Sequence, residues 1–342
     1  MRPLRFVAGL MLVWVGAGCA GRATSRVEPA AAVGEAVPRL VSTEELARWQ
    51  RQGPVSVVDV RADLLTYLKD HLPGAVYLNT ETLRASAGGI PAQLLTPRAY
   101  AELFGRLGLS IDQPVVIYSA GETRNIDATF LAWLLAGFGH PKVYVLNGGY
   151  FKWQLEQRAV VPQYPRLAAT RFPAGTFHPE QASLEDVRRA IMTGDAILVD
   201  ARPADQYAGQ AGAQMRRGHI PGAISHYWQT DLTQEGFGHV WKNPSELRAG
   251  YTAQGITPDK NIIVYCNSTT EASHVHFTLR YLLGYPRVRI YVGSWTEWAE
   301  RVDLPIEAGK QGSRLPSRSV MTLRARRRGR SLTSASAPPV TM

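Results

Sequence analysis

The sequence predicts an α/β protein of two tandem domains, each a mostly parallel sheet flanked by helices. Four segments of the first half recur in the same order in the second half. Short apolar runs rich in β-branched residues have the composition of strands buried on both faces, and helical patterns separate them. A chain of 342 residues also exceeds one typical domain of about 100–200 residues.

The repeat consists of four pairs of matched segments that lie 141 to 148 residues apart. The pairs are 55–61 with 196–202, 70–75 with 218–223, 114–125 with 261–272, and 143–153 with 288–298. Such small variation in spacing indicates a duplicated domain with minor insertions. We place the copies at residues 37–158 and 182–308, joined by a Pro-containing linker at 159–181.

The N-terminal segment, residues 1–19, has a basic start, an apolar run and three small residues before Cys19. It reads as a secretory signal, too short for a membrane span. The cysteine directly after the small residues resembles a bacterial lipoprotein signal, in which Cys19 would become the lipidated N-terminus. Residues 20–36 would then be a tether. We therefore expect export across the inner membrane and a membrane-anchored periplasmic protein; simple cleavage with an incidental Cys19 is the alternative.

Helix signals lie between the strands of both copies. Ser42 is followed three residues later by Glu45, and Ser183 by Asp186, a pattern typical of a capping box at a helix start. Apolar helical patterns later in each copy end on Gly139 and Gly284. Strand and helix therefore alternate, as in a parallel α/β sheet.

Positive charge is concentrated at the two ends. The formal net charge is +10, yet residues 311–342 hold seven Arg and no acid, and residues 1–30 carry a net +3. Residues 31–310 are thus neutral, which argues against a nucleic-acid partner. The tail, residues 309–342, is predicted to be disordered. It either contacts anionic lipid headgroups or stays solvated without a partner.

The two cysteines, Cys19 and Cys266, cannot form a disulfide framework, and their spacing fits no metal site. Cys266 follows a buried-strand pattern and precedes a helix, where backbone N–H groups would surround its sulfur and lower the thiol pKa. Small polar residues follow it, namely Asn267, Ser268, Thr269 and Thr270. They would let the loop curl around the sulfur and offer hydroxyls to a bound anion. A buried inert cysteine is the alternative interpretation.

Four ordered motifs, 199–202, 218–223, 266–268 and 293–298, resemble the tandem-domain rhodanese family of thiosulfate and 3-mercaptopyruvate sulfurtransferases. The resemblance covers residues 37–308. It implies that Cys266 takes a sulfane sulfur from a small anionic donor as a persulfide and passes it to cyanide or a thiol. It implies no cofactor beyond that persulfide, and residues 267–271, ending at Glu271, would form the persulfide cradle.

Other positions match the family with supporting roles. Asp200 and Arg202 match a pair that we expect to fix loops, and His219 is expected to be structural. Trp295 and Trp298 are expected in the core. Ser119 stands at the nucleophile position of the first copy, so we expect residues 37–158 to be an inactive domain that covers the active-site cleft.

The loop also departs from the family pattern. Glu271 stands where the family has Thr. This places a carboxylate in a loop that, by the resemblance, binds an anionic persulfide. Gln206 stands where many members have a donor-binding Arg, and we expect Arg216 or Arg217 to substitute for it. These changes leave the identity of the sulfur donor undetermined by the sequence.

Two alternatives follow from these departures. The chain could be a non-catalytic rhodanese-fold binding or scaffold protein of the cell envelope, having lost activity through Glu271 and Gln206. A cysteine-dependent phosphatase would need an Arg where Ala272 stands, which disfavours that reading. The sequence does not indicate an oligomeric state.

Overall fold

Each half of the chain builds a five-stranded sheet whose strands are all parallel, with the same order in both halves. The first order is β1-β7-β6-β2-β3, and the second, read in the same sense, is β8-β14-β13-β9-β10. The first sheet comprises β1 (Arg39–Val41), β2 (Ser56–Asp59), β3 (Ala75–Tyr77), β6 (Val115–Tyr118) and β7 (Val143–Leu146). The second comprises β8 (Gln181–Ala182), β9 (Ile197–Asp200), β10 (Ile224–Ser225), β13 (Ile262–Tyr265) and β14 (Val288–Tyr291). The predicted fold class is confirmed.

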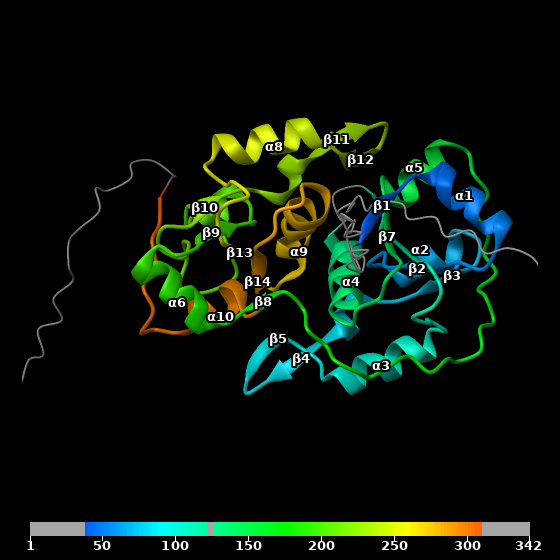
Figure 1. The fold of residues 1–342 in the computed structure, drawn as a ribbon, viewed down its shortest axis with the longest axis horizontal. Coiled ribbons are helices and arrows are strands. Elements are labelled where there is room, and N and C mark those ends of the chain that lie inside the picture. Colours follow the sequence, from blue (N-terminus) through cyan, green and yellow to red (C-terminus); the bar gives the residue numbers. More distant parts are fainter. Residues whose placement is uncertain (1–37, 122–125, 310–342) are drawn as a thin grey trace, which may run out of the picture.

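The computed structural model describes residues 38–121 and 126–309, which form two lobes side by side (Figure 1). The predicted signal segment with Cys19, the whole predicted tether (residues 20–36) and the basic tail beyond Gly309 lie outside the described residues. Among the described residues, no helix is both long and apolar enough to cross a membrane.

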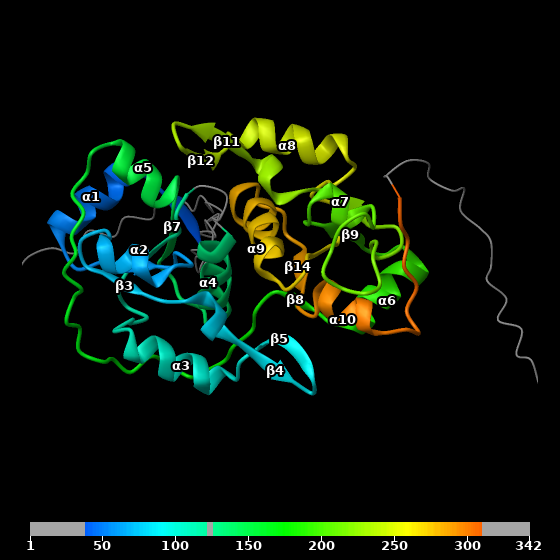
Figure 2. The same cartoon turned by 180° about the vertical axis from the view of Figure 1, so that it is seen from behind.

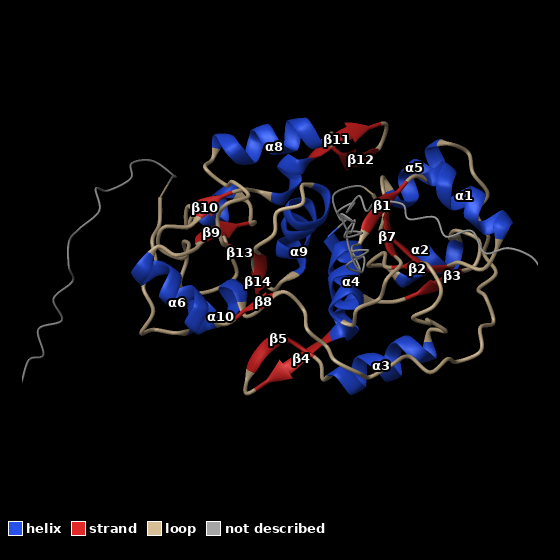
Figure 3. Ribbon diagram, in the orientation of Figure 1, coloured by secondary structure: helices blue, strands red, loops and turns tan. Residues whose placement is uncertain are grey.

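Helices cover both faces of each sheet (Figure 3). The first domain has α1 (Thr43–Gln52), α2 (Leu64–Lys69), η1 (Thr80–Leu83), α3 (Pro97–Arg106), α4 (Ile126–Gly137) and α5 (Gly149–Leu155). The second has α6 (Leu184–Thr193), α7 (Ala204–Tyr207), η2 (Trp228–Asp231), α8 (Pro244–Ala253), α9 (Thr270–His276), the π-helical η3 (Phe277–Leu282) and α10 (Ser294–Glu300). Both predicted capping boxes are confirmed, at the starts of α1 and α6. Helix α9 begins at Thr270, four residues after Cys266, as expected for a helix that follows this cysteine.

Each domain also carries an antiparallel hairpin that the sequence analysis did not predict. These are β4 (Arg84–Ala87) with β5 (Ile90–Leu94), and β11 (Leu232–Glu235) with β12 (Gly238–Trp241). The first hairpin reaches toward β14 and α10 of the second domain, and the second hairpin reaches toward α5 of the first (Figures 1 and 2). Each domain therefore extends one hairpin across the junction onto the other domain.

Helices α4 and α9 pack side by side at this junction (Figure 1). The Thr129 and Ser273 hydroxyls are 2.9 Å apart across it. Residues on every side of α4 are buried, as expected for a helix enclosed between its own sheet and the other domain. One continuous apolar core includes side chains from both domains. The helix that follows the Cys266 loop is thus fixed by the neighbouring domain as well as by its own sheet.

Candidate active site

Cys266 lies directly after β13, and the residue is 1% exposed. Its carbonyl accepts a hydrogen bond of 2.9 Å from the Trp295 N–H, and its own N–H donates to Ser294 Oγ at 3.3 Å. Both partners belong to the start of α10. The carboxyl end of a buried strand and the first turn of a helix therefore fix this backbone position.

The loop after Cys266 curls around the sulfur. Backbone N–H groups of Ser268, Glu271 and Ala272 donate to the thiol and act to lower its pKa. The curl requires Thr269 to adopt φ 82°, a left-handed conformation that is strained for a β-branched residue. Its hydroxyl donates to the Val292 carbonyl at 3.0 Å, which helps to hold this conformation. The expected ring of N–H donors around the sulfur is therefore present.

The thiol pKa is raised, so the prediction of a lowered value is wrong. Burial of Cys266, and then the negative charge of Glu271, together raise its pKa to about 12, because the three N–H donors only partly oppose these effects. Removing water from a thiolate is costly, and three backbone dipoles do not replace full hydration. The Cys266 thiol is therefore protonated at neutral pH.

Glu271 contributes a carboxyl group at the sulfur. Its negative charge acts on the Cys266 thiol and raises the pKa of that thiol. Burial, and then the negative charge of Asp200, raise the pKa of Glu271 to about 7 against the opposing charge of Arg202. Among the described residues, the buried Oε2 atom of Glu271 has no hydrogen-bond partner. The site thus contains a carboxyl that changes charge near neutral pH beside its only thiol.

Asp200 and Arg202 form a buried ion pair of 2.6 Å, and Arg202 also donates to the Gly218 carbonyl at 2.7 Å. The first domain repeats this arrangement in Asp59 and Arg61, which pair at 2.7 Å. In each domain the guanidinium links the end of a central strand to a neighbouring loop. The first domain has the same ion pair without a cysteine beside it. The pair in the second domain therefore has a structural role, holding the loop in place.

His219 also has an equivalent residue in the first domain, His71, with matching contacts. Its ring stacks on Tyr207 at 3.7 Å and its Nδ1 lies 2.8 Å from the Tyr207 carbonyl. His71 stacks on Tyr67 at 4.0 Å with the same 2.8 Å contact. Trp295 and Trp298, also predicted to be structural, are buried in the second domain's core.

Arg216 does not supply a cation to the site. Its guanidinium donates to the carbonyls of Arg301 at 2.5 Å and Leu304 at 2.7 Å, beyond the C-terminal end of α10, whereas the site lies at the N-terminal end of that helix. Arg217 is exposed. The expectation that Arg216 would replace the donor-binding Arg is therefore wrong. Gln206 does reach the loop, accepting a hydrogen bond of 3.0 Å from the Asn267 side chain.

The cation at the loop is Arg84, from the first domain's hairpin, which the sequence analysis missed. Its Nη1 donates to the Ser268 carbonyl at 2.7 Å, the Ser268 hydroxyl at 3.0 Å and the Thr270 hydroxyl at 3.1 Å. The side chain is 6% exposed. One sequence signal could have found it: the corresponding position in the second copy is Leu232, a buried apolar residue. A charged residue at such a position marks a difference in role between the two copies.

Ser119 occupies the nucleophile position of the first domain, directly after β6. Its carbonyl accepts the Tyr150 N–H at 2.9 Å, as the Cys266 carbonyl accepts the Trp295 N–H. The strand end is therefore built alike in both domains, with a thiol only in the second. Most of the loop that follows Ser119, residues 122–125, lies outside the described residues.

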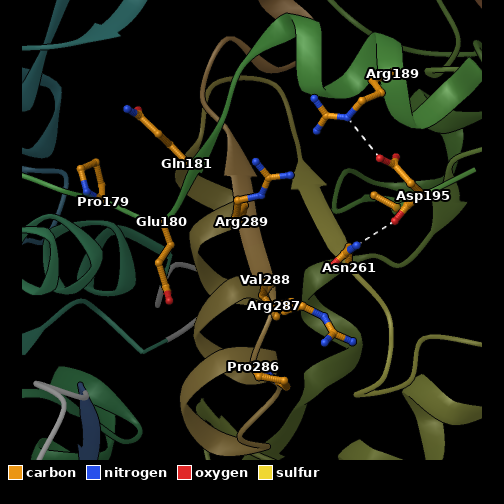
Figure 4. Close-up of a pocket in the computed structure, with 11 residues that line it drawn as sticks. Pro179, Glu180, Gln181, Arg189, Asp195, Asn261, Pro286, Arg287, Val288 and Arg289 are labelled. Carbon is orange, nitrogen blue, oxygen red and sulfur yellow. Dashed lines mark hydrogen bonds and ion pairs between the residues drawn. The ribbon is translucent and has the colours of Figure 1, made fainter. Parts of the chain in front are cut away.

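A separate surface pocket of about 470 Å³ opens near the start of β13 and β14, at the end of the sheet opposite Cys266 (Figure 4). Arg189, Arg287 and Arg289 line it, and Asp195 pairs with Arg189 there. It is not the Cys266 site. Among the described residues, no group of three or more His, Cys, Asp or Glu side chains could hold a metal ion.

Comparison with known proteins agrees with this geometry. The Rhodanese-like domain family matches residues 42–156 and 183–301. The sulfur carrier protein TtuD of Thermus thermophilus is 36% identical over 80% of this chain and 97% of its own. The 3-mercaptopyruvate sulfurtransferase of Escherichia coli is 35% identical over 71% and 85%, and the thiosulfate sulfurtransferase of Corynebacterium glutamicum 32% over 80% and 91%.

Among solved structures, SseA from Escherichia coli, described as a 3-mercaptopyruvate sulfotransferase with the rhodanese fold, superposes with a TM-score of 0.67 at 32% identity. The match covers 75% of this chain and 98% of SseA. Two family matches in tandem, full-length relatives and a superposable structure lead to one conclusion. The chain belongs to the rhodanese family.

Proposed function

We propose that the protein is a sulfurtransferase that moves a sulfane sulfur from thiosulfate or 3-mercaptopyruvate to cyanide or a thiol through a persulfide on Cys266. The observation that carries this proposal is the Cys266 sulfur, enclosed by three backbone N–H donors at the end of a buried strand. Such donors stabilise an anion on sulfur. Relatives named for both donors support it.

With thiosulfate, the Cys266 thiolate attacks the outer sulfur. A new S–S bond forms, the S–S bond of thiosulfate breaks, and sulfite leaves with its electron pair. The N–H groups of Ser268, Glu271 and Ala272 then face the anionic persulfide.

An acceptor such as cyanide completes the cycle by attacking the outer persulfide sulfur. Thiocyanate leaves, and the electron pair of the broken S–S bond returns to Cys266. No net oxidation or reduction of the protein occurs, so the reaction needs no cofactor beyond the covalent persulfide. A protein or small thiol can take the place of cyanide, as the name of TtuD, a sulfur carrier protein, illustrates for a relative.

Steady-state assay of thiocyanate formation tests this proposal with each donor separately. The wild-type protein should turn over with at least one donor, and Cys266→Ser should abolish turnover because a hydroxyl is a weak nucleophile at its ordinary pKa. Ser119→Ala, the matched change in the first domain, should keep activity. Equal activity in wild type and Cys266→Ser would refute the proposal.

A non-catalytic binding or scaffold protein is the second candidate, favoured by the missing cation at Gln206 and by the raised thiol pKa. It predicts no turnover with either donor while the protein remains folded. The same assay therefore separates the two candidates.

We also propose that the protein is exported and anchored in the envelope through a lipid on Cys19. Support comes from the sequence alone, in the order of basic start, apolar run, small residues and cysteine over residues 1–19. Mass spectrometry of the mature N-terminus should find a lipidated Cys19, and Cys19→Ala should release the protein from membranes. An unmodified Cys19 or cleavage at another residue would contradict this proposal.

A further inference from the structure

Arg84 contacts the loop after Cys266 on both sides of Thr269. Its Nη1 atom donates to the carbonyl and the hydroxyl of Ser268, at 2.7 and 3.0 Å. The same nitrogen donates to the Thr270 hydroxyl at 3.1 Å. One guanidinium nitrogen of the first domain therefore links the residue before Thr269 to the residue after it.

Thr269 is the loop residue whose backbone is strained. Its φ of 82° lies in the left-handed region, which β-branched residues rarely adopt. Rotation of the peptide between Ser268 and Thr269 would relieve this strain, but it would also turn the Ser268 carbonyl away from Arg84. The Thr269 hydroxyl is held separately by the Val292 carbonyl. The contact with Arg84 therefore opposes relaxation of the strained backbone.

We propose that Arg84 is a positioning residue for persulfide formation, which holds Thr269 in its left-handed conformation and so keeps the loop curled around Cys266. The inference rests on the proposed sulfurtransferase function, because it concerns the shape of the loop that would hold the persulfide. It extends that function by making a residue of the domain without the thiol necessary for fast chemistry.

The Arg84 guanidinium is itself fixed in place. The side chain is 6% exposed, and its Cζ atom lies 5.4 Å from the centre of the Phe130 ring on α4. Its Nη2 atom pairs with Glu81, a largely exposed carboxylate, while Nη1 faces the loop. Because these contacts already restrict its rotamers, the guanidinium loses little further conformational freedom in binding the loop.

The first copy has a related contact at the equivalent loop position. Gly121 and Ser268 each lie three residues after the end of a central strand. The Gly121 carbonyl accepts a hydrogen bond of 2.7 Å from the His239 N–H, in the hairpin of the second domain. Each hairpin thus binds this carbonyl in the other domain. At the loop that carries Cys266 the donor is a guanidinium, which also reaches two hydroxyls.

A double-mutant cycle tests the inference, with persulfide formation measured by rapid quench over a series of concentrations of each donor. Arg84→Ala should lower the rate at saturating donor roughly 10- to 100-fold, since hydrogen bonds to a charged group are lost. The half-saturating donor concentration should change little, because the loop shape and not the attraction of the donor is altered.

Thr269→Gly should rescue part of this loss. In the Arg84→Ala background it should raise the rate roughly 10-fold, because glycine adopts a positive φ without steric cost. In the wild-type background the same change should bring no gain, since Arg84 already holds this conformation. The rescue separates a positioning role from a general loss of structure, which glycine would not repair.

Hydrogen–deuterium exchange gives a readout that needs no sulfur donor. Arg84→Ala should accelerate exchange of the amides of residues 267–272 roughly 10-fold, because the loop opens more readily. Exchange in α1 should not change, which shows that the first domain remains folded. Arg98→Ala, which removes an exposed arginine of the same domain, should leave exchange at the loop unchanged.

Three results would overturn the inference. A higher half-saturating donor concentration with an unchanged saturating rate in Arg84→Ala would mean that Arg84 attracts the donor. An equal effect of Thr269→Gly in both backgrounds would mean that the two residues act independently. Unchanged exchange at the loop in Arg84→Ala would contradict the positioning role directly. Absence of persulfide in the wild type would refute the proposed function, and the exchange measurement alone would then decide whether Arg84 holds the loop.

Discussion

At the scale of single residues, the two domain copies act as internal controls for each other. Asp200 with Arg202, and Asp59 with Arg61, make the same buried pair in both copies, which identifies a shared structural role. Glu271 and Arg84 belong to the Cys266 site alone, one on its loop and one against it. Differences between the copies therefore locate the chemistry better than their similarities do.

The raised pKa of Glu271 predicts a pH-dependent cost to stability. Because its folded pKa is raised from 4.5 to about 7, protonation favours the folded state fully below about pH 4.5, and this contribution is lost as pH rises to about 7. Glu271→Gln removes the titration. Its free energy of unfolding relative to wild type should rise by about 3 kcal/mol between pH 4.5 and 8. Urea denaturation at both pH values measures this difference; a constant difference would contradict it.

Removing the acid of either buried pair should destabilise the protein. Asp200→Ala and Asp59→Ala each leave an arginine buried without its carboxylate, which costs about 3–5 kcal/mol. Thermal unfolding should show a lowered Tm for both variants. Only Asp200→Ala should also lower the pH at which the stability contribution of Glu271 is lost, because Asp200 raises the pKa of Glu271. An unchanged Tm in either variant would contradict the structural role of these pairs.

At the scale of elements, the sequence predicted what local patterns determine. Capping boxes at Ser42 and Ser183 and the position of Cys266 after a buried strand follow from neighbouring residues. The strained turn at Thr269 and the contact of Arg84 with Ser268, 184 residues away, depend on tertiary packing. No local pattern encodes such contacts, so they could not be predicted, although a charged Arg84 where the second copy has Leu232 marked a difference between the copies.

The β4–β5 hairpin should control the shape of the catalytic loop through Arg84. Arg84→Ala removes three hydrogen bonds to Ser268 and Thr270. Since one hydrogen bond to a charged group contributes about 1.5–3 kcal/mol, kcat/KM should fall roughly 10- to 100-fold. Arg84→Lys, which keeps the positive charge, should retain part of the wild-type kcat/KM. Arg98→Ala removes an exposed charge from the same domain and should have no effect; an equal loss in Arg98→Ala would contradict a specific role for Arg84.

At the scale of the whole molecule, charge and chemistry are separated along the chain. The net charge of +10 resides in the two ends, and the body of residues 31–310 is neutral. Within that body, one copy keeps the thiol while the other packs α4 against α9 and supplies Arg84 to the loop (Figure 1). The first domain is therefore part of the site, a wider role than the cover that the sequence indicated.

The central claim is that Cys266 carries the sulfur. Intact-mass and peptide mass spectrometry after incubation with thiosulfate or 3-mercaptopyruvate tests it most directly. The account predicts a gain of about 32 Da, one sulfur atom, located on the Cys266 peptide and lost again when cyanide is added. A protein that stays folded but gains no mass on Cys266 with either donor would contradict it.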